Sequence, residues 1–81
     1  AAESIKIYKE ILNSLPAGTN HYNEIILKHL IAQQYASIGD KREALKYCDE
    51  ILSIKNLDEY VYSKVESRLE RVEELRRELN K

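Results

Sequence analysis

The sequence predicts an all-α domain of four helices. One proline and two glycines, residues that interrupt helices, fall at only two places in the 81 residues, at positions 16–18 and at 39. Apolar residues recur every three or four positions between these points, the spacing that gives a helix one buried side. No segment shows the alternation of a strand. We therefore expect one domain over residues 1–81, folded as an antiparallel four-helix bundle or array.

The first two predicted helices span residues 1–15 and 21–38. Pro16 and Gly18 end the first helix, and Asn20 is the expected cap of the second. The first helix should bury Ile5, Tyr8, Ile11, Leu12 and Leu15. Apolar residues cover most of the circumference of the second helix, which is typical of a helix buried on several sides, and we expect it at the centre. Its polar residues lie close to one line: Lys28, His29, Gln33 and Ser37.

The third and fourth predicted helices span residues 41–54 and 57–80. Asp40 with Glu43, and Asn56 with Glu59, have the spacing of a capping box. The third helix should bury Ala44, Leu45, Cys48, Ile51 and Leu52. The fourth carries an apolar stripe of Val61, Val65, Leu69, Val72, Leu75 and Leu79. This stripe predicts a long C-terminal capping helix with one packed side; the alternative is a coiled-coil seam with a second copy, although Arg76 interrupts its heptads.

The composition excludes several classes of function. A net charge of −1 leaves no overall excess of Lys and Arg for nucleic acid, and no apolar run is long enough to span a membrane. The single Cys48 cannot form an internal disulfide, which favours a reducing, cytoplasmic location. We expect a monomer. The Ala-Ala start and the lack of methionine favour an excised or constructed piece.

The pair of helices from about residue 25 to residue 56 resembles the tetratricopeptide repeat. Its pattern, W-x2-L-G-x2-Y followed by A-x3-F and P, is matched by Ile31, Ala32, Tyr35 and Ala44, with Gly39 at the corner. Lys28, Cys48 and Asn56 depart from the Trp, Phe and Pro of that pattern. The resemblance implies a helical hairpin at the centre of the fold.

The first helix repeats part of the third. Ser4, Tyr8, Ile11, Leu12 and Pro16 stand 40 residues before Ala44, Cys48, Ile51, Leu52 and Asn56. The first helix therefore resembles the second half of a preceding repeat. Because about three repeats are normally needed to bury a core, the chain is either part of a longer array or a designed or chimeric protein in which the last helix closes the core.

The resemblance also implies where a ligand would bind. Members of the family hold peptides on the inner face of the first helix of each pair, which here carries Tyr22, Ile26, His29 and Gln33. The alternative is that these side chains are solvated or covered by another helix. The clamp that some members use for acidic C-termini takes residues from several repeats, so we do not expect it here.

The residue pattern predicts no catalytic, metal or cofactor site. His21 and His29 are eight residues apart, which is not the one-turn spacing of metal ligands on a helix. Cys48 lies on a predicted buried face with no neighbouring base to activate its thiol. We expect a non-enzymatic interaction module for a protein or peptide; the alternative is a designed or chimeric structural bundle with no native ligand.

Overall fold

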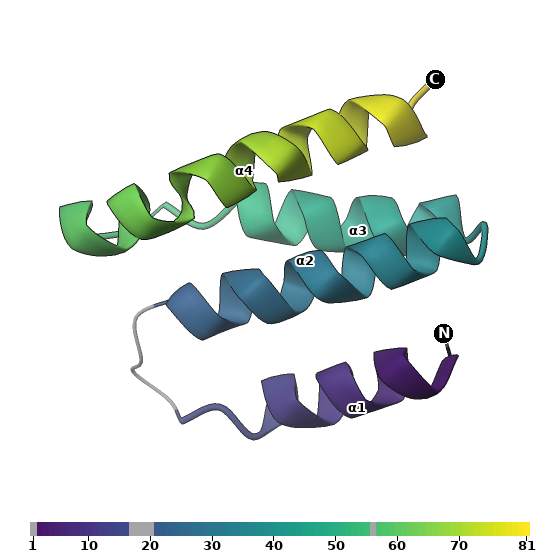
Figure 1. The fold of residues 1–81 in the computed structure, drawn as a ribbon, viewed down its shortest axis with the longest axis horizontal. Helices are drawn as coiled ribbons and strands as arrows, with labels where there is room; N and C mark the ends of the chain where they lie inside the picture. Colours follow the sequence, from purple (N-terminus) through teal and green to yellow (C-terminus); the bar gives the residue numbers. More distant parts are fainter. Residues whose placement is uncertain (1, 17–20, 56) are drawn as a thin grey trace.

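The computed structural model describes residues 2–16, 21–55 and 57–81, and these residues form four helices and no strand (Figure 1). The all-α prediction is confirmed. The helices are α1 (Ala2–Asn13), α2 (Tyr22–Ser37), α3 (Lys41–Leu52) and α4 (Glu59–Leu79). Their ends lie within a few residues of the predicted ones, which is the usual uncertainty of a helix boundary.

The central helix is α2, as its apolar circumference predicts. It packs against each of the other three helices, and α3 also packs against α4. In Figure 1, α1 and α4 lie on either side of α2, and α3 lies behind. The molecule is flat, with extents of 33 × 27 × 16 Å. Because α1 and α4 lie on opposite sides of α2, each of these outer helices keeps one side uncovered.

The corner between α2 and α3 forms as predicted. Gly39 has a φ of +85°, a conformation that residues with a Cβ rarely adopt, and the Asp40 amide donates to the Tyr35 carbonyl at 2.9 Å. The Asp40 side chain then accepts a hydrogen bond from the Glu43 amide at 3.2 Å, which caps α3. This corner positions α3 antiparallel to α2.

The caps of α2 and α4 differ from the predicted ones. The expected caps Asn20 and Asn56 lie outside the described residues. His21 precedes α2 and makes no capping bond with its side chain. Asp58 caps α4, because its side chain accepts from the Val61 amide at 2.8 Å. Helix α4 therefore starts at Glu59, two residues later than predicted.

The core lies where the four helices meet. Most of the predicted apolar stripe of α4 faces it, with Val61, Val65 and Val72 buried and Leu69, Leu75 and Leu79 partly buried. Helix α3 contributes Ala44, Cys48 and Ile51 as predicted, whereas Leu45 and Leu52, which were also predicted to be buried, are half-buried. The other buried apolar residues are Ile5, Ile25, Leu27, Ile31, Ala32 and Tyr47.

Ile11 and Tyr47 correct the predicted core. Ile11 is 46% exposed although its spacing places it on the apolar stripe of α1, because α2 covers only one side of that helix. Tyr47 is buried, and its ring stacks on Tyr35 with the centroids 6.0 Å apart. Lys9 of α1 lies over both rings.

Candidate binding face

The four residues predicted to hold a peptide do not form one exposed line. Gln33 is exposed, and Tyr22 and Ile26 are half-buried. His29 is only 2% exposed, because α4 crosses α2 there. A peptide on α2 could contact Gln33 and Ile26 but not the imidazole of His29 in this arrangement. The alternative weighed from the sequence, coverage by another helix, therefore holds for His29.

His29 is held by Arg68 of α4. The Arg68 Nη1 lies 3.0 Å from the His29 Nδ1. A guanidinium has no acceptor, so we assign Arg68 as the donor and Nδ1 as the unprotonated nitrogen of the ring. Burial, and then the charges of Arg68 and Arg71, lower the pKa of His29 from 6.5 to about 4. The imidazole is therefore neutral at physiological pH.

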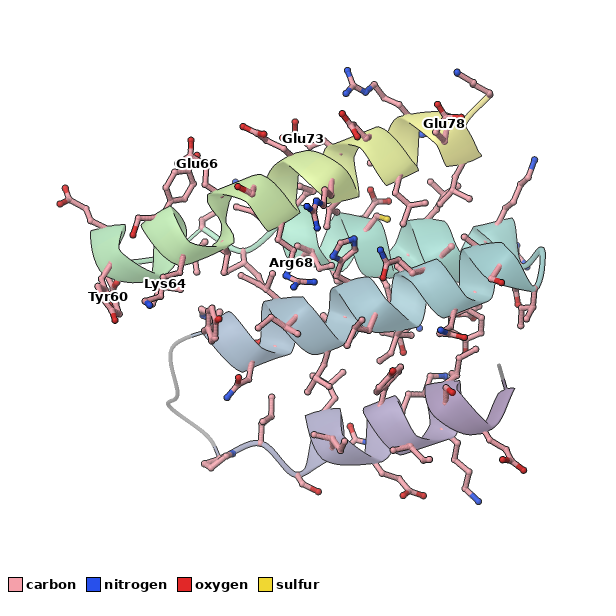
Figure 2. The ribbon with its side chains drawn as sticks, viewed as in Figure 1. Tyr60, Lys64, Glu66, Arg68, Glu73 and Glu78 are labelled. Atoms are coloured by element: carbon pink, nitrogen blue, oxygen red, sulfur yellow. The ribbon has the colours of Figure 1, made fainter. Side chains whose placement is uncertain are left out.

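Helix α4 carries cations along the edge that faces α2. Tyr60, Lys64 and Arg68 follow this edge one turn apart, and Figure 2 shows them on the side of α4 toward α2. The Lys64 ammonium lies 4.9 Å from the centroid of the Tyr60 ring, and Arg71 is close enough to act on His29. None of Lys64, Arg68 and Arg71 forms an ion pair with a residue that the structure describes. We call these three residues the cationic edge.

The opposite edge of α4 is acidic. Glu66 and Glu73 point away from α2 in Figure 2. With Glu70 they line a groove of about 470 Å³ between α4 and the end of α3, whose apolar floor includes Leu52, Leu57 and Leu69. The two edges of one helix therefore have opposite charge, so that a peptide on α2 meets only the basic edge.

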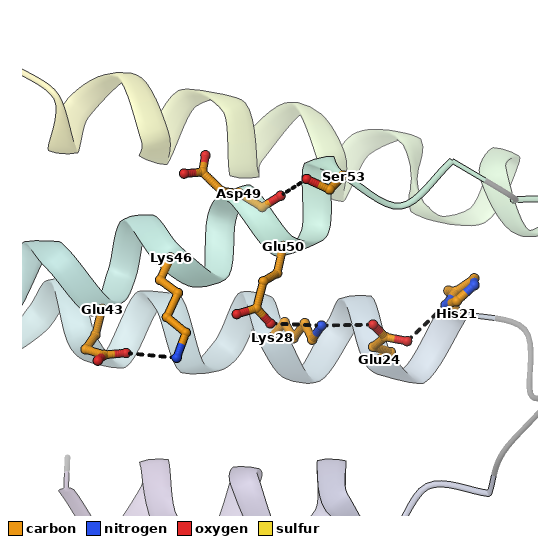
Figure 3. A network of polar contacts seen from close by, with 8 residues as sticks. All are labelled: His21, Glu24, Lys28, Glu43, Lys46, Asp49, Glu50 and Ser53. Carbon is orange, nitrogen blue, oxygen red and sulfur yellow. Dashed lines mark hydrogen bonds and ion pairs between the residues drawn. The ribbon is translucent and has the colours of Figure 1, made fainter.

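A second polar cluster joins α2 to α3 (Figure 3). The Lys28 ammonium lies 2.9 Å from a carboxylate oxygen of Glu24 and 3.1 Å from one of Glu50, and Glu24 also contacts His21 at 2.9 Å. Burial alone would raise the pKa of Glu24 and lower that of Lys28. The hydrogen bonds within the cluster outweigh burial, so that the pKa of Glu24 is lowered and that of Lys28 is raised.

This cluster lines a groove of about 520 Å³ among α1, α2 and α3, beside Leu12, Leu15 and Tyr47. Two carboxylates already share the Lys28 ammonium, so it has little capacity left for an anionic ligand. The cluster therefore positions α3 on α2. Sequence reasoning missed it because Lys28 and Glu50 are far apart in the chain, although the i to i+4 spacing of Glu24 and Lys28 was visible.

The Cys48 thiol is shielded from solvent in the core. Cys48 is fully buried, and burial, with a smaller contribution from Asp49, raises the pKa of its thiol. No group of three or more His, Cys, Asp or Glu side chains there has a metal-binding arrangement. Among the same residues, no helix is both long and apolar enough to cross a membrane.

Comparison with known proteins identifies no relative: no family model matches the chain, and neither a curated protein nor a solved structure matches it.

Proposed function

We propose that this domain is a non-enzymatic interaction module, similar to a tetratricopeptide repeat, that binds a peptide segment on α2 beside the cationic edge of α4. The observation that carries the proposal is the contact between His29 of α2 and Arg68 of the cationic edge. Ile26 and Gln33 stand one turn before and one turn after His29 on the same side of α2, and the three cations have no ion-pair partner among the described residues. An apolar contact, an amide and neighbouring positive charges together suit a peptide with an aliphatic anchor and carboxylates.

The burial of His29 makes this face different from the one predicted. Arg68 of α4 lies against His29 of α2, so that a bound peptide would contact the guanidinium of Arg68 instead of the imidazole of His29. The proposed contact residues are therefore Tyr22, Ile26 and Gln33 from α2, and Lys64 and Arg71 from α4. His29 holds Arg68 in place and does not touch the ligand.

Selection from a random twelve-residue peptide library, with the immobilised 81-residue protein as bait, tests the proposal. We expect the enriched peptides to carry Asp or Glu with an aliphatic residue, and to lose at least tenfold in affinity when Ile26→Ala and Gln33→Ala are combined. Charge reversal by Lys64→Glu with Arg71→Glu should weaken them similarly, and added salt should weaken binding to the unmodified protein.

A matched control reverses two exposed charges elsewhere. Lys41→Glu with Arg42→Glu, at the start of α3, changes the net charge by the same amount without touching the face. Peptides that respond equally to both pairs of substitutions, or a selection that enriches nothing, would refute the proposed face.

The second candidate is a structural or designed four-helix bundle without a native ligand. It is favoured by the coverage of His29 and by the regular Val and Leu stripe of α4 with its dense Glu and Arg residues. If this candidate is correct, the selection from the peptide library should enrich no sequence. Self-association through the apolar stripe of α4 would require that stripe to be exposed. Val61, Val65 and Val72 of the stripe are instead buried in the core.

A further inference from the structure

Helix α1 exposes apolar side chains on the side that α2 does not cover. Ile7 is 53% exposed and Ile11, one turn later, is 46% exposed. The opposite side of the helix packs on the core through Ile5 and Leu12. Ile7 and Ile11 therefore form an apolar surface on one side of this short helix. The amino-acid sequence indicates which kind of partner would cover it.

That indication comes from an internal repetition. Residues 3–12, ESIKIYKEIL, stand 40 positions before residues 43–52, EALKYCDEIL. One side-chain hydrogen bond to the next helix also falls at matching positions of the two segments. Lys9 of α1 donates to the Tyr35 hydroxyl of α2 at 2.7 Å, and the counterpart of Lys9, Asp49 of α3, bonds Arg76 of α4 at 2.6 Å. The side of α1 that packs on α2 therefore corresponds to the side of α3 that packs on α4.

The exposed side of α1 corresponds to the side of α3 that α2 covers. The counterparts of Ile7 and Ile11 are Tyr47 and Ile51, which are 8% and 1% exposed. Tyr47 stacks on Tyr35 of α2, and nearby Glu50 pairs with Lys28 of α2 at 3.1 Å. Helix α1 thus has the surface of α3, but among the residues that the structure describes no helix packs on α1 in the place that α2 takes on α3.

The charge on this surface follows the same correspondence. Glu10 is the counterpart of Glu50, and it is exposed. Its carboxylate forms no ion pair with any residue in the described ranges, whereas that of Glu50 holds Lys28. A helix that took the place of α2 would therefore supply a lysine opposite Glu10.

We propose that the surface formed by Ser4, Ile7, Glu10 and Ile11 docks an amphipathic helix of a partner protein, with small and aliphatic side chains facing the isoleucines and a lysine opposite Glu10. Ser4, the counterpart of the buried Ala44, leaves room for a close approach of the two helices. This surface lies on a different helix from the proposed peptide face, and neither proposal depends on the other.

A second copy of this chain does not have the required chemistry. Contact between two α1 helices would bury little beyond the isoleucines, far less than the roughly 1,000 Å² of a specific interface. The uncovered edge of α4 carries Glu66, Glu70 and Glu73, which would oppose Glu10 instead of pairing with it. A partner helix of the α2 type satisfies both the apolar and the charged part of the surface.

The sequence of α2 can serve as the probe for the partner helix. Residues 21–40 are appended directly before residue 1, so that the copy leads into α1 through the Gly39–Asp40 corner as α2 leads into α3. This short connection supplies the high effective concentration that an untethered peptide lacks. We expect a single cooperative unfolding transition, followed by circular dichroism in urea, with a midpoint above that of the 81-residue protein.

Two sets of variants show whether the gain arises from this surface. Ile7→Lys with Ile11→Lys should return the midpoint of the extended protein to that of the 81-residue protein carrying the same pair. Glu10→Lys should remove part of the gain, and adding Lys28→Glu in the appended copy should restore it. Ile38→Lys in the original α2, which replaces an exposed isoleucine outside the surface, should leave the gain unchanged.

An unchanged midpoint after extension would overturn the proposal. So would a gain that survives Ile7→Lys with Ile11→Lys, because the copy would then be stabilised elsewhere. A loss with Glu10→Lys that the reversed charge does not restore would exclude the proposed lysine on the partner.

Discussion

Acidification should destabilise the fold through one side chain, His29. Its Nδ1 accepts from Arg68 and cannot do so once protonated, and the resulting imidazolium would be buried beside Arg68 and Arg71. Burial is the largest cause and the two arginine charges add to it, so that the folded protein binds the proton only near pH 4, compared with 6.5 for an ordinary histidine.

The sign and size of the effect follow from these two values. Between pH 6.5 and pH 4 the unfolded chain binds more protons than the folded chain, so that the free energy of unfolding falls as the pH falls. The contribution of neutral His29 is complete above pH 6.5. About 2 kcal/mol of it is lost between pH 7 and pH 5. This is a substantial part of the roughly 4–12 kcal/mol expected for a domain of 81 residues.

Urea unfolding at pH 7, 6 and 5, followed by circular dichroism, measures this loss. The matched variant is His29→Asn, which keeps an acceptor for Arg68 but does not titrate. Its stability should fall by about 2 kcal/mol less than that of the original protein over the same range. A second variant, His21→Asn, replaces the half-exposed histidine beside Glu24 and leaves the contact between His29 and Arg68 intact.

Measurements above pH 5 separate His29 from the carboxylates. The pKa of Glu24 is lowered by its hydrogen bonds from His21 and Lys28, so its contribution is lost only at more acidic pH. Equal slopes for the original protein and His29→Asn between pH 7 and pH 5 would refute the reasoning, because His29 would then not be buried as a neutral group under α4. Titration of the His29 ring by NMR would give the same answer directly, with a midpoint near pH 4 expected and one near 6.5 contradicting it.

Three further predictions concern the core and a cap. Ala44→Leu should lower the free energy of unfolding by about 1–3 kcal/mol, because Ala44 is fully buried where α3 packs; an unchanged urea midpoint would mean that this contact is misplaced. Asp58→Ala should cost about 0.5–2 kcal/mol through loss of the bond to the Val61 amide, with a lower thermal midpoint as the readout and Asp58→Asn as the conservative control. The thiol of Cys48 should react with a colorimetric disulfide reagent only as fast as the protein opens, so that rapid labelling of the folded protein would contradict its burial.

Local patterns predicted the parts of this fold that depend on neighbouring residues. The stripe of α4, the apolar side of α3 and the Gly39–Asp40 corner are each set by spacing within one helix or turn, and the structure contains all three. The central place of α2 could also be predicted, because a helix with apolar residues around most of its circumference needs neighbours on several sides.

Features that depend on distant residues could not be decided from the sequence. His29 belongs by spacing to a polar line on α2, but Arg68, 39 residues later, supplies a donor that allows its burial. Tyr47 is buried because Tyr35 and Lys9, on two other helices, pack on its ring. Ile11 has the spacing of a core residue and stays exposed because no neighbouring helix covers it. Periodicity shows which side of a helix is apolar, but it does not show how many neighbours that helix has.

Net charge was the least informative quantity for the candidate site. A value of −1 removed the expectation of a nucleic-acid-binding surface, but it does not show that α4 separates its charges between two edges. The cations Lys64, Arg68 and Arg71 border α2, and Glu66, Glu70 and Glu73 border the end of α3. A ligand within a few ångströms responds to the nearest charges because salt screens the rest beyond about 8–10 Å. Two partners of opposite charge could therefore bind to different sides of α4. The rotation of α4 about its own axis determines which charged residues each partner contacts.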